Sequence, residues 1–141
     1  MTISEAIEHK RKQYQEGLQS CLCFYAFSKE QFEENKIPKN APNEEFISCG
    51  GGMYIHKSNE DKLKHFLEVD SKKLDKEFLQ NIDQKEHIYF ELLCHECFYT
   101  EQPEDILEIL KYYYTDESEE TLLQKIKEVY SEKLKERRQS Q

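Results

Sequence analysis

The stretch EEFISCGGGMYIHK, residues 44–57, decides the fold class, because it holds a strand pattern inside a chain that otherwise favours helices. It predicts two short strands, residues 45–49 and 53–57, on either side of a run of glycines. Glycine takes positive φ without steric cost, so the run suits a hairpin turn or a bulge. The glycines of this predicted turn are Gly50, Gly51 and Gly52.

Upstream of the predicted hairpin, residues 21–27 (CLCFYAF) are apolar at successive positions, which predicts a buried strand. Most of the remaining sequence favours helices, and Ser28 with Gln31 and Asp83 with Glu86 have the spacing of a capping box at two predicted helix starts. Gly17 is expected to end the first helix. The sequence therefore predicts an α+β protein, a mostly helical single domain over 1–141 with a small three-stranded antiparallel sheet. The helices are expected at about 3–16, 28–36, 83–99, 102–114 and 118–137, with residues 136–141 frayed.

Composition and net charge favour some classes of function over others. The chain has 141 residues and a formal net charge of −9, which argues against general nucleic-acid binding and favours a basic protein partner. No apolar run is long enough for a membrane span, and no signal peptide opens the chain, so we expect a protein of the host cytoplasm without membrane contact. Five cysteines form no obvious disulfide framework, which fits a reducing compartment.

Charge is concentrated near the C-terminus. Residues 101–120 hold eight acids against Lys111 alone, and a run of tyrosines follows that lysine. An acidic segment with exposed tyrosines suits contact with a basic partner, although a charge run can equally be a solvated helix face. The residues predicted to carry partner contact are Glu104, Asp105, Glu108, Tyr112, Tyr113, Tyr114, Asp116 and Glu117.

Two residue sets could bind a metal such as zinc. His87, Glu91 and His95 fall on one stripe of the helix predicted at 83–99, where two imidazoles and a carboxylate could meet an ion. The alternative interpretation of this stripe is a polar, partly exposed helix face. The second set is a possible Cys₄ site, whose thiols could instead pack as small apolar side chains. Its members would be Cys21, Cys23, Cys94 and Cys97.

Glu96 lies in the apolar arc of the same predicted helix, so we expect it to be buried. A buried glutamate needs a charged or hydrogen-bonding partner, or its pKa rises. Both a functional and a structural role are open at this position. After the glycine run, Lys57 and the helix start at Ser58 form a weaker candidate, an anion site, for which a tight turn is the simpler interpretation.

Three patterns resemble a family of small proteins carried by phages and mobile elements, whose function is unknown. They are F-x-A-F-S at residues 24–28, G-G-G-x-Y-I at 50–55 and H-E-x-F-Y-T at 95–100. The resemblance implies that His95, Glu96 and Tyr54 belong to the family pattern together with the glycine run. Small acidic proteins of this origin are similar to host-defence antagonists, including anti-CRISPR proteins.

These observations predict a binding protein without enzymatic activity and without a cofactor. It would inhibit a larger, basic, nucleic-acid-handling protein of host defence, such as a CRISPR effector, by protein–protein contact. The alternative function is a metal-binding domain or metal-dependent enzyme centred on His95 and Glu96. Either a monomer or a homodimer is compatible with the sequence.

Overall fold

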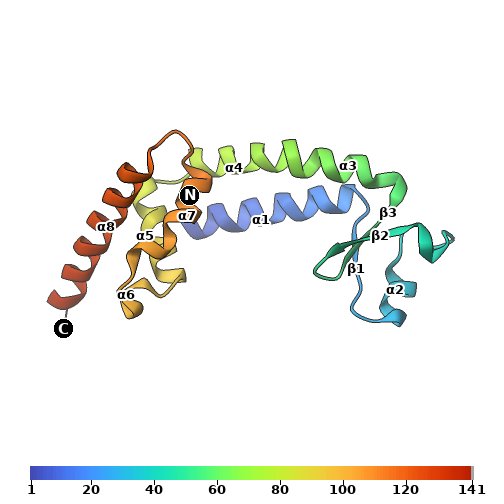
Figure 1. Ribbon diagram of the computed structural model, residues 1–141, viewed down its shortest axis with the longest axis horizontal. Helices are drawn as coiled ribbons and strands as arrows, with labels where there is room; N and C mark the ends of the chain where they lie inside the picture. Colours follow the sequence, from blue (N-terminus) through green and yellow to red (C-terminus); the bar gives the residue numbers. More distant parts are fainter. Residues whose placement is uncertain (141) are drawn as a thin grey trace. The chain divides into compact units, whose positions relative to one another are not determined.

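The computed structural model describes residues 1–140 and divides the chain into two compact units. The sheet unit is Glu8–Lys76, and the helical unit is Met1–Ile7 with Glu77–Gln141. Most of the chain is helical, and one small three-stranded antiparallel sheet is present, which confirms the predicted α+β class (Figure 1). The extent of the domain over 1–141 stays a prediction.

The sheet contains β1 (Phe24–Tyr25), β2 (Phe46–Gly50) and β3 (Met53–His56) in the order β1-β3-β2. β3 pairs antiparallel with both neighbours, and the register between β2 and β3 shifts between Ser48 and Gly50. All three glycines of the turn have positive φ, between 61° and 87°. The predicted hairpin is therefore confirmed, and glycine is needed there because other residues rarely adopt this conformation.

β1 is much shorter than the strand predicted at residues 21–27. The end of the first helix reaches into this segment, because the carbonyl oxygen of Leu18 accepts hydrogen bonds from the N–H groups of Cys21 and Cys23. Leu22, between them, has φ 61° and turns the chain. An apolar run alone does not distinguish a strand from a helix terminus that packs into a core.

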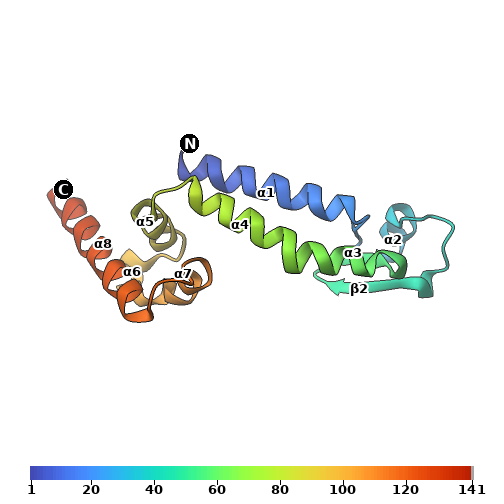
Figure 2. The same ribbon diagram turned by 90° about the horizontal axis from the view of Figure 1, so that it is seen from above.

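Most of α1 (Ile3–Ser20) belongs to the sheet unit, where it lies beside a second helical segment (Figure 2). This segment consists of α3 (Glu60–His65), the π-helical turn Phe66–Asp70 and α4 (Ser71–Gln80), whose last turn belongs to the helical unit. An ion pair of 2.7 Å joins Lys10 to Asp75. The sequence predicts that Gly17 ends the first helix, but in the structure Gly17 lies inside α1.

The reason is a close contact between two helices. The Phe66 ring packs so near Gly17 that an added Cβ there would overlap three ring carbons. Tyr14, one turn earlier on α1, stacks obliquely on the same ring at 5.2 Å between centroids. Gly17 therefore serves helix packing and not termination.

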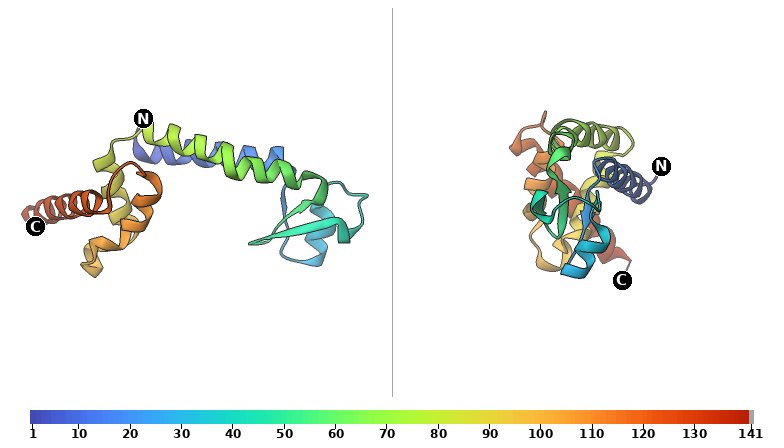
Figure 3. Two further views of the ribbon diagram at one scale, coloured as in Figure 1. Left: turned by 45° about the horizontal axis from the view of Figure 1, so that its top comes forward. Right: turned by 90° about the vertical axis from the view of Figure 1, so that its right-hand side faces the viewer.

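α2 (Lys29–Asn35) packs on the face of the sheet that carries Phe24, and it lies near the hairpin in Figure 3. Its predicted cap is confirmed, because the Ser28 hydroxyl accepts a hydrogen bond from the N–H of Gln31 at 3.1 Å. Short 3₁₀ turns, Asn43–Glu45 and Lys57–Asn59, flank the hairpin.

The helical unit contains α5 (Gln84–Cys94), α6 (Cys97–Thr100), the 3₁₀ turn Pro103–Ile106, α7 (Leu107–Tyr113) and α8 (Glu119–Gln139). Side chains of Asp83 and Ser118 cap α5 and α8. α8 continues through the tail that the sequence predicts to fray from residue 136. The core of this unit consists of Ile88, Leu92, Cys97, Ile106, Leu110, Leu122, Ile126 and Val129.

The helix predicted over 83–99 is broken between Cys94 and Cys97. His95 caps the end of α5, and Glu96 has a left-handed backbone that redirects the chain. This turn allows the Cys97 side chain to enter the core, where it is fully buried with Leu92 and Ile106. Tertiary packing thus overrides the local helix preference.

Candidate functional site

Glu96 lies in the break between α5 and α6, so the prediction that it is buried is wrong. Its side chain is exposed, and its carbonyl oxygen accepts hydrogen bonds from the N–H groups of Tyr99 and Thr100, each 3.0 Å long. A helical wheel assigns faces only while the helix continues, and α5 ends two residues earlier. The solvated carboxylate therefore needs no buried partner.

Glu91 links the two histidines of the stripe His87–Glu91–His95. Glu91 lies 3.5 Å from the Nε2 atom of each histidine. His87 is fully buried, and its Nδ1 atom lies 2.8 Å from the Tyr114 hydroxyl, whereas His95 is largely exposed. Among residues 1–140, no group of three or more His, Cys, Asp or Glu side chains is placed to hold a metal ion.

The cysteines of the possible Cys₄ set are divided between the two units. Cys21 and Cys23 belong to the sheet unit, and burial raises the pKa of each thiol, that of Cys23 to about 11. Cys94 and Cys97 belong to the helical unit, where Cys97 is a core residue and Cys94 is exposed. Packing as a small apolar side chain is therefore observed for Cys21 and Cys97, which are buried, and not for Cys94.

Five of the eight predicted contact residues are exposed, and together they are here called the acidic surface. It consists of Glu104, Asp105, Glu108, Tyr112 and Asp116. Spacing of three or four residues along the 3₁₀ turn and α7 keeps the first four on the side opposite the buried Ile106 and Leu110. Tyr112 is 62% exposed, so a large aromatic ring stands among the carboxylates.

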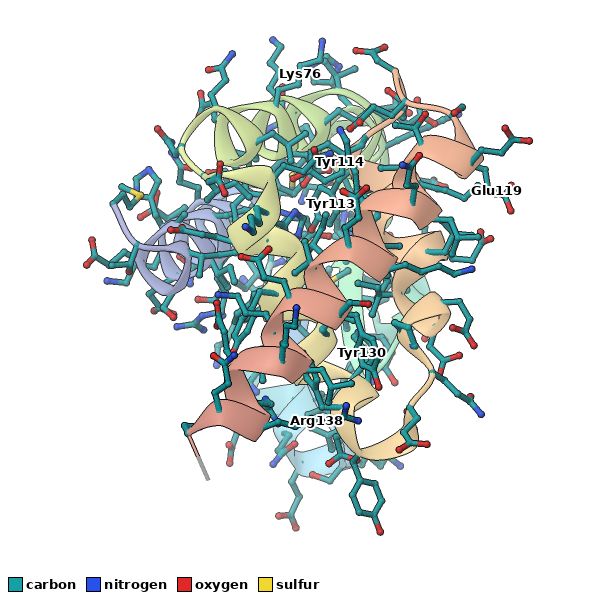
Figure 4. All side chains as sticks on the ribbon, turned by 90° about the vertical axis from the view of Figure 1, so that its left-hand side faces the viewer. Lys76, Tyr113, Tyr114, Glu119, Tyr130 and Arg138 are labelled. Atoms are coloured by element: carbon teal, nitrogen blue, oxygen red, sulfur yellow. The ribbon has the colours of Figure 1, made fainter. Side chains whose placement is uncertain are left out.

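Lys111 provides a positive charge beside the acidic surface. Its Nζ atom lies 3.3 Å from Glu119 and 3.4 Å from Glu108, and the hydrogen bonds to these glutamates raise its pKa. Figure 4 shows Glu119 extending outward from the start of α8. The lysine is thus held between two acids, whereas Glu104, Asp105 and Asp116 are exposed.

The other three predicted contact residues are bound inside the unit. The Tyr114 hydroxyl contacts His87, and burial raises the pKa of this phenol. Tyr113 packs its ring against His87 at 5.1 Å between centroids. Glu117 pairs with Lys125 and Gln84, and the hydrogen bond from Lys125 lowers the pKa of this carboxyl. These half-buried side chains hold α7 and α8 to α5, and a partner-contact role for them stays a prediction.

The contacts of the hairpin residues indicate structural roles for them. Tyr54 stacks on Phe24 at 5.9 Å between ring centroids, within an aromatic cluster on the α2 face of the sheet. Lys57 is exposed and weakly paired with Glu45. The N–H of Ser58 donates to the Nδ1 atom of His56, so the helix start proposed for anion binding already has an acceptor. The glycine run makes the turn, which supports the simpler interpretation.

One surface feature could not be predicted from the sequence patterns, because it combines segments that are far apart in the chain. The first residues of α1, one face of α5 and Lys133 of α8 line a groove of about 920 Å³ in the helical unit. Leu93 lies in this groove and is 42% exposed. Its apolar character is visible in the sequence, but its exposure depends on where α5 ends and on the position of α1.

None of the helices in the described part of the chain combines the length and the apolar character that a membrane crossing requires.

Comparison with known proteins identifies a family for this chain but no individual relative. No curated protein and no solved structure matches it. One family model, described as a family of unknown function (DUF7659), matches residues 6–133, which is most of the sequence. The chain therefore belongs to the DUF7659 family.

Proposed function

We propose that this protein is a non-enzymatic binding protein without a cofactor, which docks its acidic surface on a basic surface of a larger protein. The observation that carries the proposal is the exposure of Glu104, Asp105, Glu108 and Asp116 in the same short segment as the exposed ring of Tyr112. Interfaces commonly combine an aromatic anchor with a charged rim, and the acidic surface has both.

Electrostatics supports a basic partner. The formal net charge of −9 attracts a positively charged protein at long range, and the acidic surface directs the encounter to one side of the helical unit. Each exposed pair contributes only about 0.2–1 kcal/mol, so affinity would depend on several pairs and on the burial of Tyr112.

The more specific form of the proposal is inhibition of a nucleic-acid-handling defence protein in the cytoplasm of a host cell, such as a CRISPR effector. A protein that holds nucleic acid needs a basic channel, and an acidic protein can compete for it. The sequence patterns shared with small phage-borne proteins support this form. A purified effector would be the partner, and nucleic acid would be the competitor.

The test removes charge from the acidic surface without changing side-chain size. The triple variant Glu104→Gln, Asp105→Asn, Glu108→Gln is compared with a control that changes three exposed glutamates of the sheet unit, Glu30→Gln, Glu34→Gln, Glu44→Gln. Both variants change net charge equally. We expect the first to weaken binding to a purified effector by about tenfold or more and the control to change it little.

Salt provides a second measurement. Binding through exposed charges should weaken as the sodium chloride concentration rises, because the Debye length falls to about 3 Å at 1 M. The triple variant of the acidic surface should lose most of this dependence. Equal losses in both triple variants, or an affinity that salt does not alter, would refute docking through this surface.

Metal analysis distinguishes the proposed binding function from the alternative, a metal-binding domain or metal-dependent enzyme. Elemental analysis of the purified protein would support a metal-dependent function only if a stoichiometric ion is found and is lost in His95→Ala. The exposed position of His95 makes this variant compatible with folding, so a lost ion would report ligation and not unfolding.

A further inference from the structure

The groove of the helical unit is a docking surface distinct from the acidic surface. Its walls are residues 1–5 at the start of α1, one face of α5, and Lys133 of α8. All of these residues belong to the same compact unit. The volume of about 920 Å³ is large enough to receive several apolar side chains.

The floor of the groove is apolar. Tyr89, Phe90 and Leu93 of α5 line it, whereas Ile88 and Leu92 of the same helix face the core. Leu93, at 42% exposed, is therefore a large apolar side chain outside the core and beside two aromatic rings. Such a surface gains free energy when a partner removes it from water.

The charges at the rim of the groove are not balanced. Lys85 pairs with Glu132 at 2.7 Å, and Lys133 pairs with Glu136 at 3.4 Å, so both lysines are neutralised from outside the groove. Glu5 and Glu86 also line the groove, and within residues 1–140 neither carboxylate forms an ion pair.

Asp83 at the end of the groove adds a further acid, which caps α5. Three acids, two lysines and the amino group of Met1 line the groove, and the two lysines pair with Glu132 and Glu136 outside it, so acids are in surplus around the apolar side chains.

We infer that this groove binds an amphipathic basic helix of a partner protein. Apolar side chains on one face of that helix would enter the floor at Phe90 and Leu93, and its Lys or Arg residues would reach Glu5 and Glu86 at the rim. The inference rests on the proposed function in requiring a basic partner, but it uses residues that the acidic surface does not contain. The failure of one surface is therefore distinguishable from the failure of the other.

The experiment uses a labelled synthetic peptide of about 14 residues, made of leucine and lysine, with leucines spaced three and four apart so that they share one helical face. Binding to the whole protein is measured by fluorescence anisotropy. A peptide of the same composition with scrambled order has the same charge but no apolar face. A leucine–glutamate helix has the apolar face but the wrong charge. We expect the first peptide to bind at least about tenfold more tightly than either control.

Protein variants locate the binding. Leu93→Lys places a cation on the floor and should weaken peptide binding by about tenfold or more. Leu67→Lys is the matched control, because Leu67 is also 42% exposed but lies in the sheet unit. The double variant Glu5→Gln, Glu86→Gln should weaken binding by about threefold to tenfold and reduce its salt dependence.

The acidic-surface variant should leave peptide binding unchanged. Backbone NMR shifts on peptide addition provide a readout that needs no variant, and the largest shifts should fall in residues 1–5 and 83–93. Equal binding of the scrambled peptide, equal effects of Leu93→Lys and Leu67→Lys, shifts centred elsewhere, or no binding at about 1 mM protein would each overturn the inference.

Discussion

Replacing Gly17 by alanine should destabilise this protein, although the same change normally stabilises a helix. Inside a helix, alanine is favoured over glycine by about 0.5–1 kcal/mol. At Gly17, however, the added Cβ would lie within 3.0 Å of three carbons of the Phe66 ring, the farthest of them Cδ2 at 2.8 Å. Carbon atoms in contact are normally about 3.5–4.0 Å apart, so the ring must move.

The magnitude follows from the surroundings of Phe66. The ring is only 6% exposed and packs with Leu18, Cys21, Ile55 and Leu63. It also borders a groove of about 670 Å³ that Gly17 lines, but moving toward this groove would cost the ring some of its core contacts. Overpacking of this kind costs about 1–3 kcal/mol, which exceeds the gain in helix propensity. We expect Gly17→Ala to lower the free energy of unfolding by about 1–2 kcal/mol and the melting temperature by about 3–8 °C.

The assay is urea unfolding followed by circular dichroism, applied to a double-mutant cycle. Phe66→Leu removes the ring and lowers stability by itself through a cavity. In the Phe66→Leu background, Gly17→Ala should instead stabilise, because the clash is gone and the helix preference remains. The reasoning is refuted if Gly17→Ala stabilises the protein while Phe66 is present, or if the two substitutions prove additive.

Two further predictions concern polar contacts of the helical unit. The hydrogen bond from Lys125 lowers the folded-state pKa of Glu117, so the carboxylate stabilises the protein above its unfolded pKa of about 4.3, and this contribution is lost as pH falls through the folded pKa. In urea titrations, Glu117→Gln should therefore cost about 1 kcal/mol at neutral pH, and this cost should shrink as the pH falls through the folded-state pKa. A cost that stays the same down to the lowest pH at which the protein folds would contradict the pairing. His87→Ala should lower the free energy of unfolding by about 3 kcal/mol, because it opens a cavity and leaves the buried Tyr114 hydroxyl without its partner. Tyr114→Phe should cost about 1 kcal/mol, and equal costs for the two variants in the same assay would argue against this account of the pair.

The candidate site was only partly visible in the sequence. The run of acids predicted exposed carboxylates, and Glu104, Asp105, Glu108 and Asp116 are exposed. The neighbouring tyrosines could not be assigned in the same way, because three in a row point in different directions from a helix. Only Tyr112 points to solvent, whereas the other two pack against a histidine on α5.

Glu96 shows why a helical pattern alone can mislead. Its place in the apolar arc was deduced for an unbroken helix, and that deduction fails once the helix stops. The stop depends on Cys97 reaching a core that includes Ile106 and Leu122, which come later in the chain. A wheel drawn from one segment contains no information about those residues.

The sequence by itself determined the features that depend on neighbouring residues. Alternation and a glycine run specified the hairpin, and Ser28 and Asp83 specified helix starts, because strand pairing across a tight turn and helix capping act over a few residues. The tertiary structure decided the features that depend on distant residues. It placed Gly17 inside a helix against Phe66, shortened β1, exposed Glu96 and formed the groove beside α5. Each of these is a balance between a weak local preference and close packing with a segment that the local sequence does not contain.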